Sequence, residues 1–218
     1  MSRQIAFALA AAAALAFGGC SPSTATRKEE RPAPAAAGQE PVPDVYHVRF
    51  DTSKGLIDLE IHRDWAPRGA DHFHELVHSG FFDGARFFRV VRDFVVQFGI
   101  NGDPQTNQLW ASGMLPDDPV KEHNVKGALT FATRGANTRT TQLFINLSDN
   151  RKSLDSHGFA PIGKVAAGMD VVESLYSFYG DMPPMGQGPD PNLIQQQGNA
   201  YLENHFPRLD FIKRAVIR

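Results

Sequence analysis

The segment from Phe87 to Gly99, FFRVVRDFVVQFG, places two polar side chains that could do chemistry among aromatic and β-branched residues. Arg89 carries a permanent positive charge, and Gln97 follows as a neutral amide. A charge in so apolar a segment needs either a partner or a function. One interpretation is structural, with Arg89 paired to a carboxylate such as Asp93 and closing a barrel strand. The other is that its guanidinium offers several rigidly placed hydrogen-bond donors to a polar substrate.

A second candidate site is the segment 74–78, HELVH, which matches the H-E-x-x-H motif of zinc metalloproteases. On a helical wheel, however, His74, Glu75 and His78 point away from the apolar stripe and should face solvent. A catalytic zinc also needs a third protein ligand, and Phe81 stands where the extended motif has glycine. We therefore expect surface histidines and no metal, with a zinc metallopeptidase as the alternative. The apolar stripe consists of Ala70, Phe73, Leu76 and Val77.

Short strands must position the Arg89 segment. Alternating apolar residues predict a hairpin over 45–61, and Pro67 and Gly80 bound a helix over 67–79. The Arg89 segment itself reads as two strands separated by a turn at 92–93, with Val95 and Gln97 on one face of the second strand and Phe94 on the other. Further strands are predicted at 85–91, 94–99, 128–132, 142–147, 160–165 and 209–217, with a second helix at 169–177. Many strands and two helices favour a closed antiparallel barrel, since closure removes exposed edges.

Composition bounds the possible functions. At 218 residues with 42% hydrophobic residues, the chain is long enough for one globular domain with a good core. Its formal net charge of -2 provides no basic surface of the kind that binds nucleic acid. Cys20 is the single cysteine, so no disulfide can form within the chain.

The N-terminal residues have the pattern of an export signal. Residues 1–20 contain Arg3 and then an apolar run that is short for a membrane span. The sequence AFGGC, which ends at Cys20, resembles a bacterial lipobox, in which the cysteine is lipidated. Simple cleavage to a free periplasmic protein is the alternative. Residues 21–44 are rich in proline, alanine and charge, which predicts a disordered tether.

Three segments resemble the cyclophilin family of peptidyl-prolyl cis/trans isomerases. The segment 87–99 matches the pattern Phe-x-Arg-x-x-x-x-Phe-x-x-Gln-x-Gly. The segment 129–145, LTFATRGANTRTTQLFI, is similar to the second motif of the family, and residues 153–155 with 159–165 are similar to the part that closes its proline pocket. The resemblance extends from about residue 45 to the C-terminus, and suggests the bacterial exported or lipoprotein branch.

The resemblance implies a role for ten residues. Arg89 would be catalytic by stabilising the twisted amide without forming a covalent bond, and Gln97 would orient it. Phe159 stands where the family usually has His or Tyr, and Val95 where it usually has Met. An Arg89 buried in an ion pair, or a pocket filled by its own side chains, would rule this role out. The implied substrate-binding residues are Phe94, Val95, Gln97, Ala132, Thr133, Gln142, Phe144, Leu154 and Phe159, of which Phe144 and Leu154 could equally be core residues.

The resemblance also implies a mainly β fold, an eight-stranded antiparallel barrel capped by two helices, over residues 45–218. We expect a monomer that needs no cofactor. Its substrates would be X-Pro bonds in unfolded or flexible exported polypeptides of the bacterial envelope. It would contact the membrane only through a lipid on Cys20. A module that binds proline peptides without useful turnover is the alternative. Residues 179–208 form a Gly- and Pro-rich insert, which is either functional or mobile.

Overall fold

The computed structural model describes residues 41–218. The sequence-based predictions of a signal segment and of lipidation at Cys20 lie outside the described residues, as do residues 21–40 of the tether predicted over 21–44. The strands are β1 (Val45–Thr52), β2 (Leu56–His62), β3 (Arg89–Val91), β4 (Val95–Phe98), β5 (Ala128–Phe131), β6 (Leu143–Asn146), β7 (Pro161–Ala167) and β8 (Ile212–Ile217).

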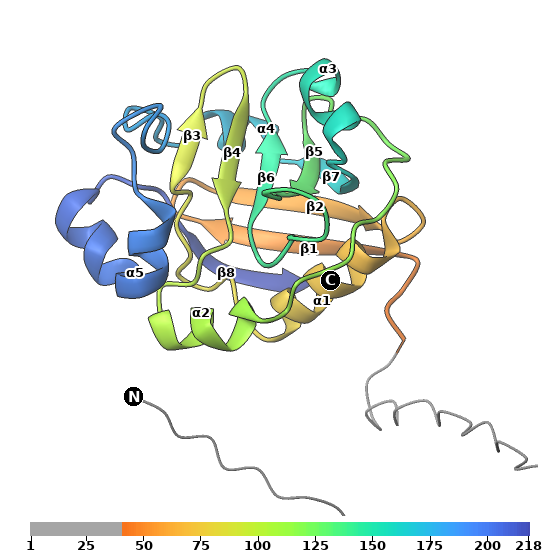
Figure 1. Ribbon diagram of the computed structural model, residues 1–218, viewed down its shortest axis with the longest axis horizontal. Coiled ribbons are helices and arrows are strands. Elements are labelled where there is room, and N and C mark those ends of the chain that lie inside the picture. Colours follow the sequence, from red (N-terminus) through yellow and green to blue (C-terminus); the bar gives the residue numbers. More distant parts are fainter. Residues whose placement is uncertain (1–40) are drawn as a thin grey trace, which may run out of the picture. The chain divides into compact units, whose positions relative to one another are not determined.

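These strands form one curled antiparallel sheet in the order β3-β4-β6-β5-β7-β2-β1-β8. In Figure 1, β3, β4, β6 and β5 run upright, and β1, β2 and β8 cross behind them. The prediction of a mainly β fold with eight antiparallel strands is confirmed. The predicted strands at 85–91 and 209–217 are shorter in the structure, because β3 and β8 begin only at Arg89 and Ile212.

The sheet curls into a half-barrel whose two end strands, β3 and β8, do not pair with each other. The chain just before β3 makes the connection instead. The amide of Gly84 donates to the carbonyl of Ile212 at 2.7 Å, and the amide of Phe87 donates to that of Asp210 at 3.0 Å. The prediction of a closed barrel is therefore wrong in one respect, because its two end strands do not pair. The backbone hydrogen bonds between residues 84–87 and 210–212 form a short seam in their place. Side chains cover that seam, since Phe88 packs with Leu209 and with two residues of the insert, Ile194 and Leu202.

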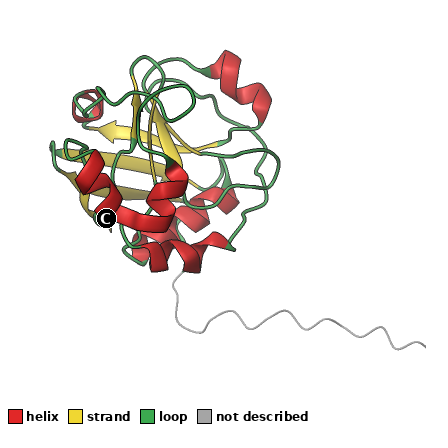
Figure 2. Cartoon of the chain, turned by 60° about the vertical axis from the view of Figure 1, so that its left-hand side comes forward, coloured by secondary structure: helices red, strands yellow, loops and turns green. Residues whose placement is uncertain are grey.

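The described residues contain more helices than the two predicted. The predicted helix over 67–79 is α1, and the one predicted over 169–177 is shorter. Two unpredicted helices each begin with an aspartate cap followed by proline, Asp103-Pro104 and Asp190-Pro191. Figure 2 shows the helices gathered mainly on one side of the strands. The helices are α1 (Pro67–His78), α2 (Pro104–Ala111), α3 (Arg151–Leu154), α4 (Met169–Glu173) and α5 (Pro191–His205), and a 3-10 turn spans Asp155–His157.

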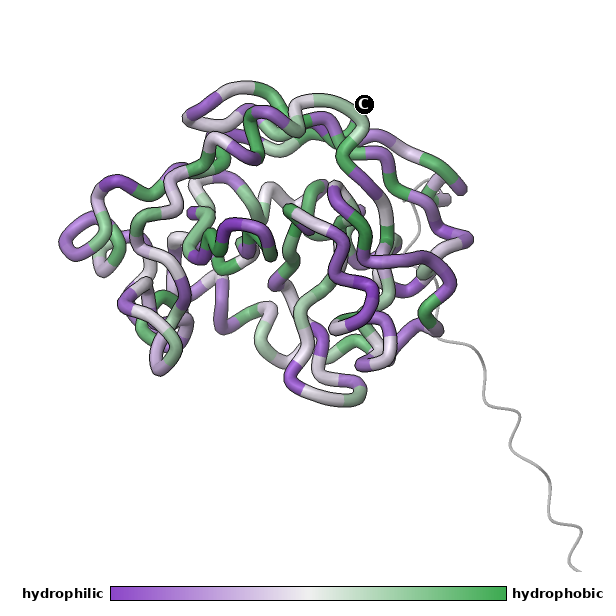
Figure 3. The backbone as a smooth tube through the Cα atoms, turned by 90° about the horizontal axis from the view of Figure 1, so that it is seen from above, coloured by the Kyte–Doolittle hydropathy of each residue, from purple (hydrophilic) through white to green (hydrophobic). Residues whose placement is uncertain are grey.

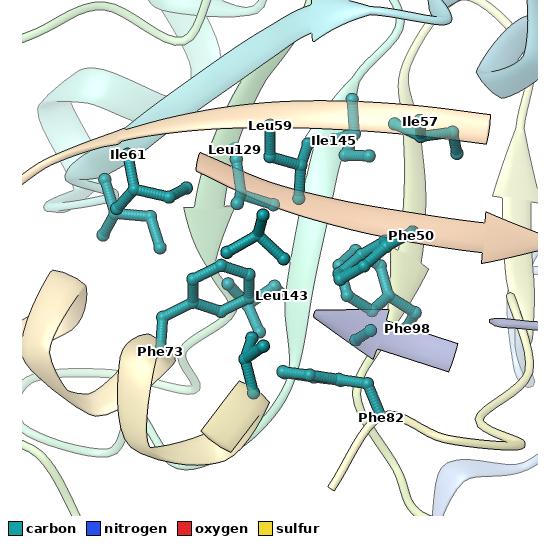
Figure 4. Close-up of a cluster of buried hydrophobic side chains, with 14 of the residues drawn as sticks. Phe50, Ile57, Leu59, Ile61, Phe73, Phe82, Phe98, Leu129, Leu143 and Ile145 are labelled. Carbon is teal, nitrogen blue, oxygen red and sulfur yellow. The ribbon is translucent and has the colours of Figure 1, made fainter. Parts of the chain in front are cut away.

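Aromatic side chains fill the space between the sheet and α1 (Figure 4). Phe50 of β1 lies 5.6 Å from Phe98 of β4 and 5.9 Å from Phe82, measured between ring centroids. Phe73 of α1 lies 5.5 Å from Phe82 in the same way. All four rings are completely buried. The interior of the curled sheet is thus occupied by side chains, so a binding site must lie on its outer surface.

Hydropathy changes every few residues along the described chain, as the colours in Figure 3 show. Among residues 41–218, the helices are all too short or too polar to cross a bilayer.

Replacing Phe50 by alanine tests the importance of this core. Because the ring is fully buried among three other phenylalanines, we expect Phe50→Ala to lower the free energy of unfolding by about 3–5 kcal/mol. Urea denaturation followed by circular dichroism would measure the loss. The control is Leu56→Ala at the start of β2, where the side chain is 49% exposed and a loss below about 1 kcal/mol is expected. Equal losses in the two variants would contradict this description of the core.

Candidate functional site

The pairing of β3, β4 and β6 places Arg89 and Gln97 side by side. Arg89 is the register partner of Gln97, and Gln97 is in turn the partner of Phe144. Arg92 and Asp93 form the turn between β3 and β4, as predicted, and Asp93 has a left-handed φ of 58° there. Two polar side chains and one aromatic ring thus lie in a row across three neighbouring strands.

An apolar slot lies beside this row. Val95, Phe144 and Leu154 form a buried cluster that is separate from the main core, and Phe94, Ala132 and Phe159 pack against it. The rings of Phe144 and Phe159 meet edge to face with centroids 5.7 Å apart. Strand alternation assigned Phe94 to the opposite face from Val95. That expectation is wrong because Phe94 belongs to the turn before β4, where alternation does not apply.

Asparagine side chains hold the ends of the slot in place. Asn150 donates from its side chain to the carbonyl of Phe94 at 2.9 Å, and Asn124 donates to the carbonyl of Phe159 at 2.8 Å. Asn124 is itself held by the carboxylate of Asp155 at 2.8 Å. Because these bonds reach the backbone, they fix the positions of both rings without using the faces that line the slot.

The guanidinium of Arg89 has two partners. Its Nη1 donates to Oε1 of Gln97 at 3.0 Å, and Nε2 of Gln97 donates to Oε1 of Gln142 at 3.0 Å. Its Nε and Nη2 donate to the two carboxylate oxygens of Asp181, at 2.6 and 3.2 Å. The guanidinium also lies 5.6 Å from the ring centroid of Phe94. Three of the five N–H donors of Arg89 are therefore used within the protein, and two remain.

The prediction that a carboxylate pairs with Arg89 is therefore correct, but the carboxylate is that of Asp181 and not that of Asp93. Asp93 lies in the adjacent turn, whereas Asp181 belongs to the insert, 92 positions along the chain. The Arg89 guanidinium, as a hydrogen-bond donor, lowers the pKa of the Asp181 carboxyl group, although burial opposes this shift. The side chains remain 16% and 25% exposed, so the ion pair is partly open to solvent. The condition that would have ruled out a role for Arg89, a buried ion pair, is met only in part.

The slot is also not filled by its own side chains. Arg89 and the slot line one open groove of about 510 Å³. All ten residues that the resemblance pointed to lie along it, while their individual roles in binding stay predictions. They are Arg89, Phe94, Val95, Gln97, Ala132, Thr133, Gln142, Phe144, Leu154 and Phe159.

Sequence reasoning missed the residues that the insert and the region of α2 contribute to the groove. The insert contributes Met182, Pro191 and Gln195, and the region of α2 contributes Ala111 and Met114. An aspartate cap followed by proline marks the start of both α2 and α5 and could have revealed these helices. For α5, the high glycine and proline content of the insert obscured this signal. No local pattern pairs residue 181 with residue 89.

The H-E-x-x-H motif lies on α1, away from the residues of the groove. Glu75 and His78 are exposed, whereas His74 is half-buried against the ring of Tyr46, with centroids 5.2 Å apart. Burial lowers the pKa of His74, which favours the neutral form of its imidazole. Within residues 41–218, no three histidine, cysteine or acidic side chains come together in a metal-binding arrangement.

Sequence comparison relates the chain to known isomerases. Residues 47–191 match the family described as "Cyclophilin type peptidyl-prolyl cis-trans isomerase/CLD". A peptidyl-prolyl cis-trans isomerase of Acinetobacter baylyi is 30% identical over 68% of this chain and 79% of its own length. Peptidyl-prolyl cis-trans isomerase-like 1 of Rhizopus delemar is 33% identical over 59% of this chain and 78% of its own length.

Solved structures agree with the fold. A cyclophilin-type peptidyl-prolyl cis-trans isomerase of Cryptosporidium parvum superposes with a TM-score of 0.56 at 21% identity, covering 80% of this chain and 98% of its own. The cyclophilin AquaCyp293 of Hirschia baltica gives a TM-score of 0.52 at 16% identity, with coverages of 80% and 77%. Because the identities are low, these structures support the architecture alone.

Proposed function

The chain belongs to the cyclophilin-type peptidyl-prolyl cis-trans isomerase family and isomerises X-Pro bonds, and we propose that Arg89 and the apolar slot perform this reaction. The observation that supports this assignment is their juxtaposition: a partly exposed guanidinium lies 5.6 Å from the centroid of the Phe94 ring, which packs against the apolar slot. A proline ring occupies the slot, and its amide lies against Arg89.

The reaction needs no covalent step. Rotation about a peptide bond is opposed by about 18–20 kcal/mol, because the nitrogen shares its lone pair with the carbonyl group. At the midpoint of rotation the amide is twisted and the lone pair is localised on nitrogen. A donor aimed at that nitrogen, or at the neighbouring prolyl carbonyl, stabilises the twisted form more than either planar isomer. Arg89 retains N–H groups for this purpose, and Gln97 holds its plane.

The apolar slot keeps one side of the rotating bond still. Burying a proline ring against Val95, Phe144 and Leu154 contributes about 2 kcal/mol of binding. The residues before proline lie against Ala132, Thr133 and Gln142 on the adjoining wall. The substrates are proline-containing segments of unfolded or flexible chains, because a folded chain rarely presents an X-Pro bond that can enter a groove.

The setting we propose is the bacterial cell envelope. Residues 1–20 have the pattern of an export signal that ends in a lipobox-like sequence, and residues 21–44 have the composition of a tether. A lipid on Cys20 would hold a monomeric domain at the membrane, where newly exported chains are still unfolded.

Substitution of Arg89 tests the assignment of the catalytic group. We expect Arg89→Ala and Arg89→Lys each to lower kcat/KM for a proline tetrapeptide by at least about tenfold, because lysine keeps the charge but loses the planar fork of donors. A protease-coupled assay measures the rate. The matched control is Arg92→Lys in the next turn, whose Nε donates to Ser177 and which does not line the groove. Parental rates in both Arg89 variants would show that Arg89 is not the catalytic group, whereas a parent as slow as the uncatalysed peptide would favour a module that binds proline peptides.

The pH dependence should be nearly flat around neutrality. The charged side chains bound to each other at the reaction centre are Arg89 and Asp181, and a guanidinium keeps its proton throughout this range. Because Arg89 lowers the pKa of Asp181, that carboxylate stays ionised until the pH falls below the ordinary carboxyl range. We expect kcat/KM to vary by less than about twofold between about pH 6 and 8. A bell-shaped profile in this range would show that a histidine takes part.

Metabolic labelling with palmitate tests the proposed anchor. In a bacterial host, we expect the full chain to incorporate labelled palmitate and to fractionate with membranes, and we expect Cys20→Ser to do neither. An unlabelled protein in the periplasmic fraction would leave simple cleavage as the export route. Retention of the parent in the cytoplasm would contradict export altogether.

A further inference from the structure

Asp181 is the residue of the insert that binds the reaction centre. Both of its carboxylate oxygens accept hydrogen bonds from Arg89, at 2.6 and 3.2 Å. Oδ1 also accepts from the backbone amide of Met182 at 2.8 Å. The carboxylate therefore occupies the Nε–Nη2 edge of the guanidinium, an edge that presents two parallel donors side by side.

The loop around Asp181 is shaped to hold it there. The amide of Gly188 donates to the carbonyl of Asp181 at 2.8 Å, which closes the loop on itself. A Cβ atom at Gly186 would collide with the backbone of Asp181, and one at Gly188 would lie 2.9 Å from its carbonyl oxygen. Since only glycine permits so close an approach at both positions, the loop can pack directly against the residue that carries the carboxylate.

The rest of the insert is fixed to the barrel. The amide of Asn199 in α5 donates to the carbonyl of Gly102 at 2.9 Å, and its side chain donates to the carbonyl of Gly84 at 3.1 Å. Gly198, with a φ of 60°, lets α5 approach Gly102 so closely that any side chain would collide. Ile194 of α5 is buried with Phe88 at the barrel seam. The insert thus presents Asp181 from a firm support rather than from a free loop.

Asp181 lies next to the groove. The next residue, Met182, lines the same groove as Arg89 and the slot. A peptide whose proline ring enters the slot must lay its prolyl carbonyl against the guanidinium that Asp181 holds. The carboxylate and the substrate carbonyl are both hydrogen-bond acceptors, and the carboxylate takes two of the four N–H groups that Gln97 leaves free. A carbonyl that binds at the Nε–Nη2 edge therefore competes with Asp181.

We propose that Asp181 is an intramolecular competitor that reduces the affinity of the groove for proline peptides, and that substrate must displace its carboxylate from Arg89. This inference rests on the isomerase activity proposed above. The pair has enough exposure for the carboxylate to turn toward solvent when a peptide arrives. If the groove is competent only while the pair is open, the apparent dissociation constant equals the intrinsic one divided by the fraction of time that the pair is open. The insert then selects for substrates that bind Arg89 strongly.

The alternative is that Asp181 orients Arg89 for catalysis. The other contacts of Arg89 argue against this role. Gln97 already holds Nη1 of Arg89 and is itself held by Gln142. The ring of Phe94 lies against the guanidinium as well. Orientation is therefore provided without Asp181, whereas its negative charge, 2.6 Å from Nε, offsets the positive charge that should stabilise a twisted amide.

Neutralising the carboxylate tests the proposal. We expect Asp181→Asn and Asp181→Ala to lower KM for an uncharged proline tetrapeptide by about five- to thirtyfold, the range that a partly exposed charge-assisted pair supports, with kcat within about twofold of the parent. NMR titration with the same peptide should show the same gain in affinity. Thermal unfolding of each variant checks that it is folded.

The matched control is Glu203→Gln. Glu203 lies on α5 and binds Arg86 at 3.0 Å, so this change also removes an ion pair between insert and barrel, but at residues that do not line the groove. We expect its KM to equal that of the parent. If it gained affinity as much as the Asp181 variants, loosening of the insert would explain the result and the competition would be wrong.

The remaining outcomes are equally decisive. An unchanged or higher KM in folded Asp181 variants would overturn the proposal, and a lower kcat would make Asp181 a positioning residue for Arg89. These results are distinct from a failure of the isomerase assignment. In that case the parent, Arg89→Ala and Asp181→Asn would all be as slow as the uncatalysed peptide.

Discussion

The organisation of the site depends on how one guanidinium shares its hydrogen bonds. Arg89 divides its N–H groups between an amide that is part of the barrel and a carboxylate that is part of the insert. The amide, Gln97, is 6% exposed and sits on a strand whose four residues are all buried, so it cannot move far. The carboxylate of Asp181 lies nearer to solvent. This difference in freedom makes Gln97 the fixed support of Arg89 and Asp181 its exchangeable partner.

The curled sheet separates the hydrophobic core from the groove that contains Arg89. On β4, Val96 and Phe98 enter the main core, while Val95 and Gln97 face the groove. Alternation along a single short strand therefore supplies both the packing and the site. The insert contributes Met182, Pro191 and Gln195 to the groove, and none of these residues belongs to the main core.

Much of this could be predicted from the sequence, because the signals are local. Arg89 and Gln97 stand out as polar residues in an apolar segment, and the turn at 92–93 separates two short strands as expected. The slot could be recognised only through resemblance, since Phe144 and Leu154 look like any core residues. Phe94 was placed on the wrong face by alternation because it precedes its strand.

The contacts made by the insert could not be predicted in the same way. The pairing of Arg89 with Asp181 spans 92 positions, and hydrophobic periodicity carries no information about such a contact. The helix α5 does have a start signal at Asp190-Pro191, but Gly198 interrupts its pattern. That glycine is present because the helix must approach the backbone of Gly102, which is a tertiary requirement.

A crystal structure with the dipeptide Ala-Pro bound tests the central claim most directly. The Cryptosporidium parvum relative has been solved in the presence of this dipeptide. For the present chain, the account predicts the proline ring against Phe144, an N–H of Arg89 within hydrogen-bond distance of the prolyl group, and the carboxylate of Asp181 turned away from the guanidinium. An Arg89 still bound by both oxygens of Asp181, with the dipeptide elsewhere or out of its reach, would contradict it.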